Sequence, residues 1–159
     1  MKIDGTHYRS IWLGDDQKTV KIIEQRLLPH ELQVVDLKSR EDAAIAIKDM
    51  WVRGAPLIGA TAAYGMALAM ADDPSDANLE KSWEILHETR PTAINLRWAL
   101  NRAKAHLGAM APEERAAAAY KLAAEICDED VEINRSIGEN GLKLIEEIAA
   151  KKAPGETIN

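Results

Sequence analysis

The segment that decides the fold is Trp51–Gly65, with the sequence WVRGAPLIGATAAYG. Pro56 fits the first turn of a helix, where its missing N–H and its fixed φ are tolerated. Ala55 is then the predicted N-cap, and its side chain offers no oxygen to the free amides of that turn. Because those amides and Arg53 carry positive charge, the segment predicts either an anion site, best suited to phosphate, or a tight helix–helix turn with a solvated arginine.

The pattern from Pro56 to Met70 is apolar on almost every side and rich in alanine. Gly59 and Gly65 would each destabilise an exposed helix by about 1 kcal/mol relative to alanine. A helix that is apolar all round is normally buried. We therefore expect this helix to lie at the centre of the domain.

Before this helix, residues 8–37 carry a pattern typical of β-structure. Three short runs rich in β-branched or apolar residues are separated by Gly14–Gln17 and by Pro29-His30, which favour turns. The runs predict a small antiparallel meander with one face to bury. Its expected strands are Tyr8–Leu13, Thr19–Gln25 and Leu32–Leu37.

The rest of the chain predicts helices. Ser39 and Asp42 have the spacing of a capping box, so a helix is expected to follow with an apolar stripe that includes Met50 and Trp51. A second amphipathic pattern ends near Thr89, and a third is expected to begin at Thr92 as N-cap and to end at Gly108. Its predicted core positions are Ile94, Trp98, Leu100 and Ala105. A long helix is expected to begin at Pro112. Further along it, Gly138 and Gly141 would allow a kink or a close contact with a neighbour.

Composition excludes several classes of function. The formal net charge is −6, which argues against non-specific binding to nucleic acid or to an anionic membrane. Cys127, the single cysteine, excludes an internal disulfide, and the carboxylates that follow it disfavour a reactive thiolate. The four histidines lack metal-ligand spacing, so no metal site is predicted. No signal-peptide core or long apolar run occurs, and we expect a cytoplasmic protein.

A second arginine repeats the arrangement at Arg53. Arg90 precedes Pro91 in a loop that leads into a predicted helix. Arginine suits phosphate because its planar guanidinium binds two oxygens at once. The pair indicates a shared anion pocket, although two solvated arginines would give the same pattern. Trp51, Trp83 and Trp98 are interpreted as core residues rather than ligand platforms.

Two blocks of the sequence resemble the methylthioribose-1-phosphate isomerase family. The first runs from Arg53-Gly54-Ala55-Pro56-Leu57-Ile58-Gly59 to Ala62-Ala63-Tyr64-Gly65, and the second is Arg90-Pro91-Thr92-Ala93-Ile94-Asn95-Leu96 with Trp98-Ala99-Leu100. Residues 8–37 and 137–141 are similar too, so the resemblance extends over nearly the whole chain. It implies that Arg53, Gly54, Ala55 and Arg90 bind the phosphate of a phosphorylated sugar.

The resemblance also implies a larger protein. The family joins a small N-terminal β/helical domain to a Rossmann-like α/β domain, forms homodimers, and isomerises 5-methylthioribose 1-phosphate to 5-methylthioribulose 1-phosphate in methionine salvage without metal or organic cofactor. Residues 1–153 match the first domain, and 154–159, with Thr157-Ile158, are expected to begin a linker or strand into the second. The family's catalytic cysteine and aspartate have no counterpart here, and Cys127 does not match that cysteine. The chain alone is therefore expected to be inactive. Because the helices would lack the partner surface of the second domain, it is also expected to self-associate or to be poorly soluble.

Two other functions stay open. Ribose-1,5-bisphosphate isomerase is a relative that acts on a different sugar. The superfamily also includes non-catalytic regulatory subunits of a translation-initiation exchange factor, in which the same scaffold serves assembly. The intact Arg53-Gly54-Ala55-Pro56 motif and the Arg90 block favour the methylthioribose enzyme.

Overall fold

The computed structural model describes residues 2–3, 5–153 and 155–158, which form a mostly helical α+β structure as predicted. The chain divides into two units, Met1–Cys127 and Asp128–Asn159. Residues 155–158 are not in a strand, and Pro154 and Asn159 lie outside the described residues. The expected boundary between 153 and 154 therefore stays a prediction.

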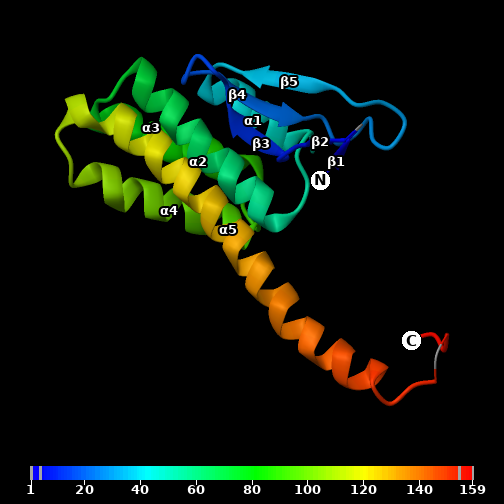
Figure 1. The fold of residues 1–159 in the computed structure, drawn as a ribbon. Coiled ribbons are helices and arrows are strands. Elements are labelled where there is room, and N and C mark those ends of the chain that lie inside the picture. The colour runs from blue at the N-terminus through cyan, green and yellow to red at the C-terminus, as the bar shows by residue number, and fades with distance from the viewer. Residues whose placement is uncertain (1, 4, 154, 159) are drawn as a thin grey trace. The chain divides into compact units, whose positions relative to one another are not determined.

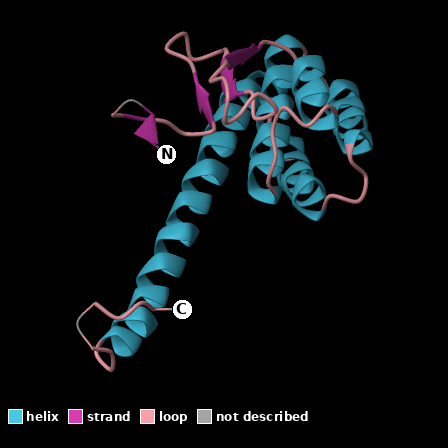
Figure 2. Cartoon of the chain, turned by 90° about the vertical axis from the view of Figure 1, so that its right-hand side faces the viewer, coloured by secondary structure: helices cyan, strands magenta, loops and turns pink. Residues whose placement is uncertain are grey.

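The three predicted strands are present, but they are shorter than expected. They are β3 (Ile11–Leu13), β4 (Val20–Ile23) and β5 (Val34–Leu37), paired antiparallel in the order β3-β4-β5. A hairpin of β1 (Lys2–Ile3) and β2 (Thr6–His7) precedes them and was not predicted. The sheet lies beside the helices of the first unit (Figures 1 and 2). Val20 and Ile22 lie on one face of β4 and are buried, and Ile23, which points to the opposite face, is buried as well.

Five helices follow the sheet. Their bounds are α1 (Arg40–Lys48), α2 (Ala55–Asp72), α3 (Asp76–Thr89), α4 (Ile94–Gly108) and α5 (Pro112–Ala149). The predicted capping box of α1 is confirmed, because the Ser39 side chain accepts from the Asp42 N–H while the Asp42 side chain accepts from the Ser39 N–H. Met50 was expected in the apolar stripe of α1. Instead it lies beyond the end of the helix with φ 58° and is exposed.

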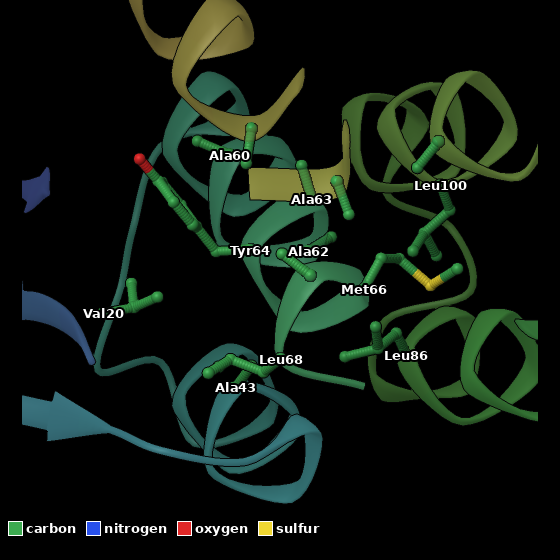
Figure 3. Packing of buried hydrophobic residues seen from close by; sticks show 14 of the residues in the cluster. Val20, Ala43, Ala60, Ala62, Ala63, Tyr64, Met66, Leu68, Leu86 and Leu100 are labelled. Carbon is green, nitrogen blue, oxygen red and sulfur yellow. The ribbon is translucent and has the colours of Figure 1, made fainter. Parts of the chain in front are cut away.

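Helix α2 is the centre of the first unit, as the sequence predicted. Every residue from Ile58 to Met70 is buried. The helix packs against α1, α3, α4 and β3. In Figure 3 the Met66 side chain points toward Leu86 of α3 and Leu100 of α4. A helix surrounded in this way needs no polar face, which explains its uniformly apolar sequence.

The two glycines of α2 allow this packing. A Cβ at Gly59 would lie 3.0 Å from the backbone oxygen of Asn95 in α4, and a Cβ at Gly65 would lie 3.1 Å from the Cβ of Ala43 in α1. Both separations are tighter than ordinary carbon contacts. The glycines therefore let the backbones of neighbouring helices approach, and this gain offsets their low helix propensity.

The predicted core face of α4 is partly wrong. Ile94 and Trp98 are 73% and 48% exposed, and Ala105 is also exposed. The buried face consists of Leu96, Ala99, Leu100, Ala103 and Leu107. The contact at Gly59 explains this rotation, since it requires the Asn95 backbone and the small side chain of Ala99 to face α2.

The first part of α5 belongs to the first unit and is anchored by Arg115, which is 3% exposed. Its Nε donates to the Leu107 carbonyl at 3.0 Å, one terminal nitrogen donates to the Pro74 carbonyl at 2.8 Å, and the other bonds to Asp76 at 2.6 Å. Every nitrogen of the buried guanidinium is thus used to tie α5 to the start of α3 and the end of α4.

The second unit contains the rest of α5, which is one unbroken helix to Ala149. The close contact considered at Gly138 and Gly141 is not observed, because a Cβ at either would meet nothing within 4 Å among the described residues. Seven large aliphatic side chains of this part are at least 45% exposed: Val131, Ile133, Ile137, Leu142, Leu144, Ile145 and Ile148. Such a concentration of exposed apolar residues is typical of a surface that is covered by a partner.

Replacement of Gly59 by alanine tests the packing of α2 against α4. The added methyl group would press on the Asn95 carbonyl, so we expect the free energy of unfolding to fall by about 1 kcal/mol despite the better helix propensity of alanine. Gly138→Ala is the matched control, because its methyl group meets open space and should raise stability by about 0.5–1 kcal/mol. Urea unfolding of both variants checks the difference. A stabilising Gly59→Ala would contradict this packing.

The exposed aliphatic residues of α5 predict self-association of the chain. We expect the average mass in sedimentation experiments to rise with protein concentration, and Leu144→Glu to reduce that rise by placing a charge among these residues. Ser136→Glu adds the same charge outside this aliphatic set and serves as the control. A monomer at all accessible concentrations would show that these side chains do not drive association.

Candidate anion-binding site

Arg53 and Gly54 form the last part of the loop between α1 and α2. Gly54 is the N-cap of α2, with φ 95° and ψ 132°, a conformation that residues with side chains rarely adopt. Ala55 is therefore the first residue of the helix, and its prediction as N-cap was wrong. The positive φ gives the reason, because only glycine reaches this geometry without strain. Arg53, Gly54, Ala55 and Pro56 are all exposed.

The start of α2 has no side-chain cap. The Ile58 N–H donates to the Gly54 carbonyl at 3.0 Å, which is the first bond of the helix. Two other helices of the first unit begin differently, since Ser39 caps α1 and Ser75 caps α3. The uncapped first turn of α2 therefore presents free N–H groups and the positive end of a helix dipole to solvent.

Arg90 is the C-cap of α3 and lies further from the next helix than predicted. The Ala93 N–H donates to the Arg90 carbonyl at 2.9 Å, so Arg90–Ala93 forms a turn with Pro91 and Thr92 in the middle. The N-cap of α4 is Ala93, and the prediction of Thr92 was wrong. Like α2, α4 has no side-chain cap.

The starts of α2 and α4 lie at one place in the fold. The close approach of Gly59 to Asn95 joins the second turn of α2 to the first turn of α4. Gly54 precedes Gly59 by five residues, which is about 7.5 Å of helix rise. Ala93 precedes Asn95 by two residues, which is about 3 Å. Both uncapped helix starts therefore lie within about one and a half helical turns of the same contact.

The two arginines are available to a ligand. Among the described residues, neither the Arg53 nor the Arg90 guanidinium has a hydrogen-bond or ion-pair partner. Arg26, Arg40 and Arg115 are each engaged with a carboxylate. A guanidinium without a protein partner beside free helix amides is suited to bind an anion with two or more oxygens.

The turn after β4 supports the Arg53 segment through Gln25, two residues beyond the end of the strand and not singled out by the sequence pattern. The Gln25 N–H donates to the Trp51 carbonyl at 2.9 Å, and the Gln25 Oε1 accepts from the Arg53 N–H at 2.8 Å. Gln25 and Arg53 are 28 positions apart. No local sequence pattern links residues this far apart, so only the tertiary structure could reveal the pairing.

Glu24, the residue before Gln25, is buried and paired with Arg26. The Arg26 Nε lies 3.0 Å from one carboxylate oxygen and a terminal nitrogen lies 2.8 Å from the other. The Arg26 guanidinium, hydrogen-bonded to Glu24, holds the pKa of that carboxyl below its ordinary value of 4.5, and the charge of Arg53 adds to the effect. The Arg26 guanidinium also lies 5.3 Å from the centre of the Trp51 ring.

Other residues considered from the sequence do not join this site. Cys127 is half-buried in α5, and no group of three His, Cys, Asp or Glu residues in the described part of the chain could hold a metal ion. Trp51 and Trp83 are half-buried against the core, as predicted, whereas Trp98 is exposed beside Arg102. No helix of the described residues is long and apolar enough to span a bilayer.

These features define a mostly helical α+β domain with two uncapped helix starts, each preceded by an arginine that has no partner in the described part of the chain. Residues 51–151 match the sequence profile of the Initiation factor 2 subunit family. The chain therefore belongs to this family.

Relatives with two different names share this fold. Methylthioribose-1-phosphate isomerase of Sinorhizobium medicae (strain WSM419) is 64% identical over 158 residues, which are 99% of this chain and 43% of that protein. The crystal structure of 5-methylthioribose 1-phosphate isomerase from Pyrococcus horikoshii OT3 has a TM-score of 0.77 and 41% identity, with 85% of this chain and 40% of that chain covered. The translation initiation factor eIF-2B subunit delta from A. fulgidus also gives 0.77, at 39% identity and with 87% and 42% covered.

Glu24→Gln tests the ion pair beneath the Arg53 segment. A carboxyl whose pKa is lowered by folding stabilises the folded state above pH 4.5, and this contribution falls as the pH drops below 4.5 toward the folded-state pKa. We expect the variant to lose about 1 kcal/mol of unfolding free energy at pH 7, with a smaller difference from the wild type at pH 4. Urea unfolding at both pH values measures this. Glu31→Gln, at an exposed position in the next loop, is the control, and a loss independent of pH would contradict the ion-pair explanation.

Proposed function

We propose that this chain is the phosphate-binding N-terminal part of an aldose–ketose isomerase that converts 5-methylthioribose 1-phosphate to 5-methylthioribulose 1-phosphate in methionine salvage. The observations that carry the proposal are two uncapped helix starts close to the Gly59–Asn95 contact, each preceded by an arginine that has no partner among the described residues. A sugar phosphate supplies the anion that this arrangement lacks. The 64% identity to a protein named methylthioribose-1-phosphate isomerase supports the choice of sugar.

In this proposal the chain contributes binding and orientation. The guanidinium groups of Arg53 and Arg90 and the amides at Gly54 and Ala55 hold the phosphate on C1 of the sugar. Holding a substrate in a reactive geometry can supply several kcal/mol of the barrier reduction, about 7–11 kcal/mol in the best cases. The groups that move hydrogen between C1 and C2 lie, by the family resemblance, in the Rossmann-like domain. No metal or organic cofactor is needed for the role proposed here.

The main alternative is a regulatory or assembly module. The two solved relatives named as an isomerase and as an initiation-factor subunit have the same TM-score and nearly the same identity to this chain, so the fold alone does not choose between them. The available guanidinium groups of Arg53 and Arg90 favour the catalytic alternative, because a scaffold has no evident use for two uncapped and positively charged helix starts. Ribose-1,5-bisphosphate isomerase remains the alternative within enzymes, since a second phosphate would suit the same chemistry.

The proposed partners follow from the same assignment. A phosphorylated sugar is the proposed ligand, and the net charge of −6 argues against nucleic acid and anionic membranes. We propose a homodimer for the complete protein and a cytoplasmic location, in agreement with the single cysteine of this chain.

Arg53→Ala tests the proposed site. In ³¹P NMR titrations of 5-methylthioribose 1-phosphate with this chain, we expect saturable binding that weakens about 10–100-fold in the variant, since charged hydrogen bonds to phosphate are lost. Arg135→Ala removes the same charge from an arginine already paired with Glu132 and Glu139, and should leave affinity nearly unchanged. The same spectra should contain no product signals.

Three results would contradict parts of this proposal. Absence of binding to the unmodified chain would refute the phosphate site. Turnover by the chain would refute the assignment of hydrogen transfer to another domain. Tighter binding of ribose 1,5-bisphosphate than of the methylthio sugar, measured in the same way, would favour the alternative enzyme.

A further inference from the structure

Gln25 makes two hydrogen bonds to the segment that carries Arg53. Its N–H donates to the Trp51 carbonyl at 2.9 Å, and its side-chain oxygen accepts from the Arg53 N–H at 2.8 Å. In a hydrogen-bonded pair of an antiparallel sheet, the backbone N–H of each residue donates to the backbone carbonyl of the other. Here the backbone of Gln25 supplies the donor and its side chain supplies the acceptor, so the loop is fixed to the turn after β4 without forming a strand itself.

These two bonds hold the chain directly before the start of α2. Arg53 is the last residue before Gly54, whose φ of 95° turns the chain into the helix. A loop held on both sides of Val52, which is fully buried, has little freedom to swing. The direction in which the Arg53 side chain leaves the backbone is thereby set relative to the free amides of α2.

The carboxylate nearest to this segment does not engage the Arg53 guanidinium. The neighbouring carboxylate, Glu24, is close enough for Arg53 to lower its pKa further, yet both of its oxygens bond to Arg26. The Arg26 side chain is itself located over Trp51, 5.3 Å from the ring centre. Glu24 is therefore satisfied by a different arginine, and its carboxylate does not hold the Arg53 guanidinium against the protein.

We propose that Gln25 is a positioning residue for the anion site. Its side-chain amide fixes the Arg53 backbone so that the guanidinium and the first amides of α2 face the same phosphate. This inference rests on the function proposed above and assigns to the turn after β4 a role that the site residues themselves do not reveal. Glutamine suits the role because its side chain accepts a hydrogen bond without adding a negative charge beside Arg53.

Gln25→Met tests the proposal, because methionine has similar length and no comparable acceptor. We expect the Arg53 amide proton to exchange about fivefold to tenfold faster, and inorganic phosphate to bind about fivefold more weakly by ¹H–¹⁵N NMR, since one hydrogen bond is lost. Gln25→Glu keeps the acceptor and should restore slow exchange at Arg53. Its added charge should still weaken phosphate binding, in a manner that salt reduces.

The control is Gln33→Met, which changes an exposed glutamine in the loop before β5 and should alter neither measurement. Urea unfolding of each variant separates local effects from loss of the fold. Unchanged phosphate affinity in Gln25→Met would overturn the positioning role, whether or not Arg53 exchange changes. Absence of phosphate-induced shifts in the unmodified chain would instead refute the proposed function and, with it, the ligand that Gln25 is proposed to serve.

Discussion

The structure depends on the burial of one helix on all sides. From Ile58 to Met70 no residue of α2 reaches solvent to a substantial extent, so its neighbours must cover its whole circumference. That demand explains the small residues, since Gly59 lets the backbone of α4 approach and Gly65 makes room for the side chains of Ala43 in α1 and Leu86 in α3. Strand β3 completes the wall on one side of α2.

The same constraint places polar chemistry at the start of the helix. A helix buried along its length can present charge to solvent only at its ends, and residues 53–56 are exposed where α2 begins. Gly59 then brings the start of α4 alongside, so two positive helix ends are held together. The contrast with α1 and α3 is informative, because serine caps both of those helices. The helices α2 and α4, which Arg53 and Arg90 precede, have no such cap.

The sequence predicted features that depend on local pattern. Alternation and turn residues predicted the meander, apolar composition predicted the burial of α2, and the Ser39 spacing predicted the capping box of α1. The errors concern features that depend on backbone geometry or on contacts between distant segments. The N-cap moved to Gly54 because the turn needs a positive φ, and Ile94 and Trp98 are exposed because a contact in α2 sets the rotation of α4.

In the candidate site, too, the residues with a local sequence signal were predicted and those that depend on distant contacts were not. Arg53 and Arg90 could be named from sequence because each precedes a helix signal, whereas Gln25 acts across 28 positions and has no local signature. Neither guanidinium has a hydrogen-bond or ion-pair partner among the described residues, and each arginine precedes a helix start without a side-chain cap. A bound phosphate would give both guanidinium groups an anionic partner, and this is the physical reason for which we propose a binding role for the pair.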